Sequence, residues 1–331
     1  MSIRDGGAQR REHEENVFRR MNEEAISVNQ DNEFRYIAYG LQDGVARITL
    51  NQPERMNVLG IGPGSSRDEI ARAMALADAD EQVGVVLIDA AGGAFCAGGD
   101  LTGAAPAETP LDEHLFSERI LQFYAAFRAM HKPVIAAVHG LCLGAGMGMI
   151  AQCDIVLAAD DARFGLVEGR IGHPGASELV PLIGATWAKY LILTGDYIDA
   201  WRAADIGLVL TVLPESMLHE RAFDLARRIA RMPRESVLLN KACIDGMSDA
   251  MGRHAARLVG RAHDTITKSM SSHACAPDGR RFVDILREGG MPALKRARDA
   301  QFTGSWLEPL RRAWPDAGQE AQQIYEPKEK K

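Results

Sequence analysis

The sequence predicts an α/β fold followed by a helical C-terminal region. Up to about residue 214, strand-like apolar runs alternate with helical patterns, as expected of strands joined by helices. From Glu215 onward the apolar spacing is almost wholly helical, over 216–231, 233–246, 250–271, 279–288 and 291–301. We therefore expect a charged N-terminal extension at 1–33, an α/β core at 34–214, helices at 215–302 and a tail at 303–331.

The elements of the core follow from local signals. Apolar runs at 34–41 and 45–50 flank Asp43-Gly44, which favours a β-hairpin. Ser65 and Ser66, followed by acidic residues, predict the start of a helix that runs to Ala79. Further on we expect strands at 83–89, 134–138 and 155–159, helices at 115–130, 146–152, 188–193 and 200–205, and a loop at 102–112. In the extension, Val17, Phe18, Met21 and Ala25 fit either an amphipathic helix or a solvated arm.

Composition and charge limit the partners. The chain has 331 residues, 46% hydrophobic and 25% charged, which is ordinary for a soluble globular protein. Its net charge of −7 argues against nucleic acid or an anionic membrane as the main partner. No run approaches the roughly 18 apolar residues of a membrane span, and the charged N-terminus does not resemble a secretory signal. Five cysteines without a C-x-x-C pair suggest reduced thiols, so we expect a cytoplasmic protein.

Two turns of small residues carry the functional signal. Phe95–Leu101 follows the apolar run 85–88, and His139–Met149 follows the run 134–138. Turns this poor in side chains let backbone N–H groups approach a ligand closely. Two such N–H groups directed at one carbonyl oxygen would form an oxyanion hole, although each turn alone equally fits a tight turn packed in a core.

Together with their flanking motifs, these turns resemble the crotonase superfamily of enoyl-CoA hydratases and isomerases. The motifs are the Asn-Pro stretch Asn51–Leu59, the A-F-C-A-G-G-D-L stretch 94–101, and Lys132–Gly146. The resemblance extends from about Phe34 to Phe302. It implies the crotonase-type ββα spiral with a helical C-terminal region, an acyl-CoA substrate, and a homotrimer or dimer of trimers.

The resemblance also implies roles for particular residues. The N–H groups of Ala97 and Ala145 would form the oxyanion hole, and Glu168 would transfer the proton. No metal and no permanently bound cofactor is implied, because coenzyme A arrives as part of the substrate. The residues implied in binding the substrate or its CoA group are Arg55, Met56, Asn57, Ala97, Gly98, Gly99, Asp100, Leu101, Gly144, Lys295, Arg296 and Phe302. Lys295 and Arg296 equally fit a solvated helix face.

The sequence departs from the family pattern at several places. Gly148 occupies the position where typical hydratases have a second glutamate, so only Glu168 remains. A single carboxylate can move a proton between two carbons but is poorly equipped to hold a water molecule. The segment 172–178 is shorter than in relatives, so His173 or Glu178 could supply a second acid or base. Alternatively, His173 is a hydrogen-bonded histidine of the loop, and Glu178 is a carboxylate at the start of a helix.

We therefore expect an acyl-CoA enzyme that works through an enolate, with isomerisation first and hydration second. Hydrolysis of a C–C or thioester bond in a ring or branched acyl-CoA is a third possibility. The alternative that the protein is a catalytically weak CoA-binding scaffold also stays open. A nicotinamide oxidoreductase is disfavoured, because the six residues between Gly148 and Ile155 are too few for a crossover helix.

Overall fold

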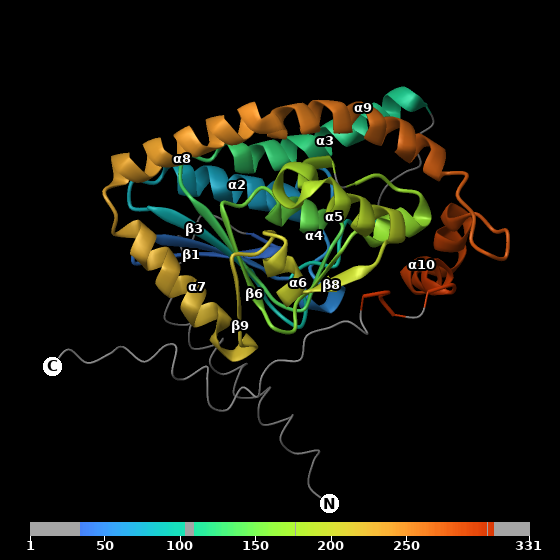
Figure 1. Ribbon diagram of the computed structural model, residues 1–331, viewed down its shortest axis with the longest axis horizontal. Helices are drawn as coiled ribbons and strands as arrows, with labels where there is room; N and C mark the ends of the chain where they lie inside the picture. The colour runs from blue at the N-terminus through green and yellow to red at the C-terminus, as the bar shows by residue number, and fades with distance from the viewer. Residues whose placement is uncertain (1–33, 103–108, 176, 303, 308–331) are drawn as a thin grey trace, which may run out of the picture.

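The computed structural model describes residues 34–102, 109–175, 177–302 and 304–307. The predicted extension at 1–33 and most of the predicted tail lie outside these ranges. A six-stranded sheet forms the centre, with α2 (Ser66–Ala79), α3 (Pro110–Ala129), α8 (Arg234–Ser248) and α9 (His254–Ser271) on one side (Figure 1). Helix α7 (Glu215–Ala230) packs on the opposite face.

The strand order of this sheet is β1-β2-β3-β4-β6-β9. The predicted hairpin is confirmed: β1 (Ile37–Gln42) pairs antiparallel with β2 (Val45–Leu50), and Asp43 and Gly44 both have positive φ. The other strands, β3 (Val85–Ala90), β4 (Val134–Val138), β6 (Ile155–Ala159) and β9 (Thr211–Leu213), pair in parallel. Parallel pairing brings the C-terminal ends of β3 and β4, and hence both small-residue turns, to one edge.

Helices pack on both faces of the sheet. Because alternate strand residues point to opposite faces, the side chains on both faces are buried. Val85 and Leu87 face α7, where they join a cluster with Leu218, Ala222 and Ala226. Val86 and Ile88 face the larger cluster with residues of α2 and α3. The continuous apolar runs in the sequence are therefore strands covered on two sides.

A second sheet of three short strands was not expected from the sequence. It consists of β5 (Leu141–Leu143), β7 (Arg163–Gly165) and β8 (Tyr197–Asp199), in the order β5-β7-β8. Strands of three residues show no periodicity, so only their pairing reveals them. This sheet matters for the site, because β5 connects directly to α4 (Ala145–Ile150) and β7 leads into the 3-10 turn η2 (Val167–Ile171).

Two core helices begin earlier than predicted. Helix α3 begins at Pro110 rather than Leu115, because Thr109 and Asp112 form a reciprocal capping box. Helix α5 (Val180–Thr194) begins eight residues before the predicted 188–193 segment and is interrupted at Gly184, where φ is 76°. The α2 prediction is confirmed, with Ser65 accepting a hydrogen bond from the Asp68 N–H. Short turns η1 (Pro53–Arg55) and η3 (Ser177–Leu179) and helix α6 (Ala200–Asp205) complete the core.

Beyond α7, the chain is helical as predicted. Helices α8 and α9 are joined by the π-helical turn η4 (Asp249–Arg253) and run end to end along α3 (Figure 1). The predicted break between the helices 279–288 and 291–301 is confirmed, because α10 (Phe282–Asp299) consists of two helical segments separated at Gly290, where φ is 65°. In the described part of the tail, Ser305 donates a hydrogen bond to Tyr197 O at 2.8 Å. No described helix has the length and apolarity that a membrane span requires.

Candidate active site

The two small-residue turns lie against each other. The Cys96 N–H donates to Leu141 O at 2.9 Å, and the Leu143 N–H donates back to Cys96 O at 2.8 Å. Glycine is required at position 146, because a Cβ there would lie 2.9 Å from the Cβ of Cys96. The N-terminus of α4 therefore sits directly on the first turn.

The prediction that the Ala97 N–H is an oxyanion donor is wrong, because this N–H donates to Met56 O at 2.9 Å. The neighbouring Gly99 has the geometry expected of Ala97. Leu59 pairs with Gly98 O and the Asp100 N–H, which leaves the Gly99 N–H directed away from Leu59 and, among the described residues, without an acceptor.

The Ala145 N–H, like the Gly99 N–H, has no acceptor among the described residues. Ala145 is the first residue of α4, and no described residue accepts its N–H. A Cβ built on Gly99 would lie 3.9 Å from the Cβ of Ala145, so the two backbones are close neighbours. Two free N–H groups so close together can receive one oxygen atom, and the helix dipole of α4 favours negative charge there.

The carboxyl group of Glu168 lies beside this pair. Glu168 is on η2, and its Oε2 lies 2.9 Å from the position that a Cβ on Gly144 would occupy. Gly144 has a φ of 47°, and its N–H donates to Gly165 O at 2.9 Å, which holds η2 close to α4. Oε2 is buried with no hydrogen-bond partner among the described residues. Burial raises the pKa of Glu168 to about 7, even though Arg298 opposes the shift.

Tyr124 fills the space beside Gly148, a contact that we did not predict from the sequence. A Cβ on Gly148 would lie 2.5 Å from the Tyr124 hydroxyl oxygen, which donates to Ala145 O at 3.3 Å. Burial raises the pKa of Tyr124 to about 12, so the hydroxyl is a neutral donor at physiological pH. The missing side chain at position 148 was the available signal, but the residue that fills its place is 24 positions away in the sequence.

The two alternative acid–base candidates have different environments. The His173 N–H donates to Glu168 O at 3.0 Å, so its backbone lies next to the site. Burial, aided by the charge of Lys268, lowers the pKa of His173 to about 4, which makes the ring neutral at pH 7. Glu178 accepts a hydrogen bond from the Gln152 amide, and burial raises its pKa.

The Asn57 side chain holds the Asn-Pro loop together and ties it to the segment at 91–94. Asn57 is 2% exposed, and its side chain accepts from the Gln52 N–H at 2.7 Å and donates to the carbonyl oxygens of Ala91 and Ala94 at 2.9 and 2.8 Å. A side-chain contact between Asn57 and CoA is therefore excluded, because its hydrogen-bonding groups are already committed to the scaffold.

The other predicted binding residues near this loop remain predictions. Arg55 pairs with Asp100 at 2.8 Å, and Met56 has a φ of 53°. Burial alone would raise the pKa of Asp100, but hydrogen bonds from Thr102 and Arg55 bring it below its usual value. Leu101 packs against the apolar cluster of α10.

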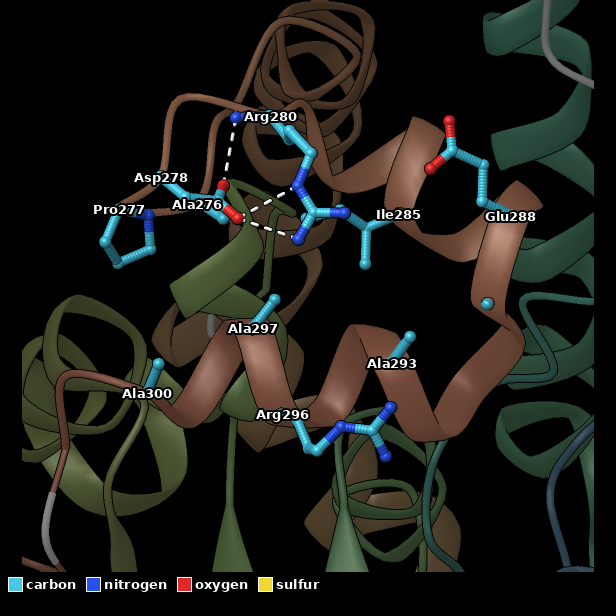
Figure 2. Close-up of a pocket in the computed structure, with 11 residues that line it drawn as sticks. Ala276, Pro277, Asp278, Arg280, Ile285, Glu288, Ala293, Arg296, Ala297 and Ala300 are labelled. Atoms are coloured by element: carbon cyan, nitrogen blue, oxygen red, sulfur yellow. Dashed lines mark hydrogen bonds and ion pairs between the residues drawn. The ribbon is translucent and has the colours of Figure 1, made fainter.

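The predicted C-terminal binding residues lie on or after α10. Arg296 is exposed and lines a hollow of about 470 Å³ between α10 and the loop at 276–280 (Figure 2). In Figure 2, Arg280 faces the same hollow and is held by Asp278. The lining includes neither Lys295 nor Glu168. Phe302 stacks on the Arg170 guanidinium at 3.9 Å, so part of its ring already has a partner. The described residues include no group of three side chains suited to a metal ion.

Comparison with known proteins identifies the family. Residues 40–274 match the family described as enoyl-CoA hydratase/isomerase. The 2,3-dehydroadipyl-CoA hydratase of Escherichia coli is 36% identical over 194 residues, which are 57% of this chain and 74% of that protein.

Solved structures agree with the sequence comparison. An enoyl-CoA hydratase/isomerase from Xanthobacter autotrophicus Py2 has a TM-score of 0.75 at 33% identity, covering 82% of this chain and all of that one. An enoyl-CoA hydratase from Mycobacterium smegmatis has a TM-score of 0.73 at 29% identity, covering 83% of this chain and 96% of that one. The predicted crotonase fold is thus confirmed, and this chain belongs to the enoyl-CoA hydratase/isomerase family.

Proposed function

We propose that this protein is an acyl-CoA enzyme that stabilises a thioester enolate and transfers a proton with Glu168. The observation that carries the proposal is the Glu168 carboxyl group: its Oε2 has no hydrogen-bond partner among the described residues, burial raises its pKa to about 7, and it lies against Gly144, one residue before Ala145. A base with a pKa near the working pH is well suited to proton transfer at carbon.

The mechanism starts with the thioester oxygen between the N–H groups of Gly99 and Ala145. As Glu168 removes a proton from the α carbon of a 3-enoyl-CoA, negative charge develops on this oxygen. Each of the two donors contributes about 3–4 kcal/mol to lowering the barrier. Glu168 then returns the proton to the γ carbon, which moves the double bond to the 2-position without changing the mass.

Isomerisation is favoured over hydration because the site has one carboxylate where water addition uses two. Tyr124 occupies the place of a side chain at position 148, and its pKa of about 12 makes it a donor rather than a base. Hydration is the second candidate, supported by the family and by relatives that carry the name hydratase. Coenzyme A enters with the substrate, and Arg55, Lys295 and Arg296 are the cations proposed to contact its phosphates.

A homotrimer or dimer of trimers in the cytoplasm completes the proposal. Helix α8 has no buried residue, and large apolar side chains along α8, η4 and α9 are exposed. Among them are Leu239, Ile244 and Met251, which are 71%, 68% and 82% exposed. An apolar face of this size is typical of a surface that a second copy covers. Analytical ultracentrifugation of the wild type and of Ile244→Glu tests this part.

The deciding experiment assays wild type, Glu168→Gln and Glu54→Gln on 2-enoyl-, 3-enoyl- and 3-oxoacyl-CoA thioesters in D2O. Glu54 is an exposed glutamate on η1 and serves as the matched control. We expect turnover to be lost in Glu168→Gln alone. A product with the elemental formula of the substrate, apart from exchange of hydrogen for deuterium, indicates isomerisation, and a gain of one D2O indicates hydration. Full activity of Glu168→Gln would refute the role assigned to this residue.

A further inference from the structure

A buried arginine on α2 lies beside the proposed oxyanion hole without an acidic partner. Arg67 is 5% exposed, and its Nη1 donates to Leu59 O at 2.6 Å and to Gly60 O at 3.0 Å. Its Nε is buried and has no partner among the described residues. Its charge is therefore not balanced by the contacts that hold it in place.

Two other arginines whose side chains are little exposed are neutralised by aspartates, whereas Arg253, which is 8% exposed, donates to Ala151 O and forms no ion pair with a described carboxylate. Arg47 pairs with Asp89 at 2.6 Å, and Arg170 pairs with Asp196 at 2.7 Å. Within the described part of the chain, Arg67 forms no such ion pair with a carboxylate. Burying an unpaired charge is costly, and Arg67 differs from Arg253 in lying next to Gly99, so its charge points to an anion that arrives at this site from outside the chain.

The guanidinium of Arg67 lies next to Gly99, one of the two proposed oxyanion donors. Its Nη2 lies 3.7 Å from the position that a Cβ on Gly99 would occupy, and its guanidinium lies 5.7 Å from the centre of the Phe123 ring. The positive charge of Arg67 also partly offsets the effect of burial on the pKa of Tyr124. Arg67 also hydrogen-bonds to the Tyr124 hydroxyl, whose own proton is donated to Ala145 O, so the cation next to Gly99 is Arg67.

The neighbouring charged groups do not remove this positive charge. Lys268 of α9 lies 3.5 Å from the centre of the Phe116 ring and pairs with Glu113 at 3.2 Å. Burial lowers the pKa of Lys268, Glu113 opposes that shift, and the charge of Arg67 adds to it, so the two cations influence each other. Glu113 balances Lys268, which leaves Arg67 as the local excess of positive charge.

We propose that Arg67 binds a carboxylate on the acyl group, so that the substrate is the CoA thioester of a dicarboxylic acid. This inference rests on the proposed acyl-CoA function and specifies its substrate class. The planar guanidinium suits a carboxylate, because it offers several N–H donors in one plane. The nearness of Arg67 to Gly99 favours a short chain between the thioester and the carboxylate.

Binding of saturated acyl-CoAs tests the proposal independently of turnover. Isothermal titration calorimetry compares malonyl-, glutaryl- and adipyl-CoA with the neutral acyl-CoA of equal carbon number, for wild type, Arg67→Gln and Arg67→Lys. Arg72→Gln is the matched control, because Arg72 is an exposed arginine of the same helix. We expect wild type and Arg72→Gln to bind at least one dicarboxylic thioester about tenfold or more tightly than its neutral counterpart.

We expect Arg67→Gln to lose this preference and Arg67→Lys to keep part of it. Equal affinity of the wild type for both members of every pair would overturn the proposal, even if Arg67→Gln did not fold. A preference for the dicarboxylic thioester that persists in Arg67→Gln would also overturn the proposal. If Arg67→Gln bound neutral and dicarboxylic acyl-CoAs equally more weakly than wild type, the proposal would be overturned as well, and Arg67 would be assigned to the thioester oxygen instead. Wild type that binds neither class would refute the acyl-CoA function itself.

Discussion

Replacing Glu168 by glutamine should change how the stability of the protein depends on pH. The ordinary pKa of this carboxyl group is 4.5, and burial raises it to about 7 in the folded protein. The folded state therefore holds the proton more tightly than the unfolded state. The stability that this group contributes is fully present below pH 4.5 and is lost as the pH rises through 7. Glutamine does not titrate, so the variant does not undergo this loss.

The size of the effect follows from the pKa difference. One pKa unit corresponds to about 1.4 kcal/mol, so the full shift corresponds to about 3 kcal/mol of unfolding free energy. Glu168 as a whole residue is only part-buried, although its Oε2 is buried, so solvent screening makes this an upper limit. Most of the change falls between pH 5 and pH 8.5.

Urea unfolding of wild type, Glu168→Gln and Glu54→Gln at pH 5 and pH 8.5 measures this effect. We expect Glu168→Gln to gain up to about 3 kcal/mol over wild type between the two pH values, and Glu54→Gln to gain almost nothing. Other groups with shifted pKa values, such as His173, are present in all three proteins and cancel in the comparison.

Kinetics give a second readout of the same group. Because the carboxylate is the base, kcat/KM of the wild type should rise with pH and level off above about pH 7, and Glu168→Gln should lower it by about 10²–10⁴-fold. If Glu168→Gln and Glu54→Gln showed the same pH dependence of stability as wild type, Glu168 would titrate like a surface carboxyl group and the argument from burial would fail.

Three further substitutions test the packing of the site. Gly148→Ala places a methyl group 2.5 Å from the Tyr124 hydroxyl, so urea unfolding should show a loss of about 1–3 kcal/mol that is largely absent in a Tyr124→Ala background. Gly144→Ala combines a φ of 47° with a contact at 2.9 Å to Glu168, so turnover should fall at least about tenfold while acyl-CoA binding persists. Asn57→Ala leaves three buried backbone groups unpaired and should cost about 3 kcal/mol or more in the same unfolding assay.

Local patterns in the sequence were sufficient for much of the architecture. The Asp43-Gly44 hairpin, the Ser65 cap of α2 and the strands that precede both turns are encoded by neighbouring residues, because turn chemistry, capping and apolar periodicity act over a few positions. The same short motifs led to Glu168 and to the N-terminus of α4. The strands β5, β7 and β8 carry no such signal and form only through pairing with distant segments.

The chemistry of the site depends on contacts between residues far apart in the sequence. An N–H group is available to a ligand only if no neighbouring segment accepts it, and Met56 O, in the turn after η1, accepts the Ala97 N–H but not that of Gly99. The space at Gly148 is filled from α3 by Tyr124, and no local pattern shows which side chain occupies a vacated volume. The lack of an acidic partner for Arg67 is likewise visible only in three dimensions, because pairing and burial of a charge depend on everything packed around it.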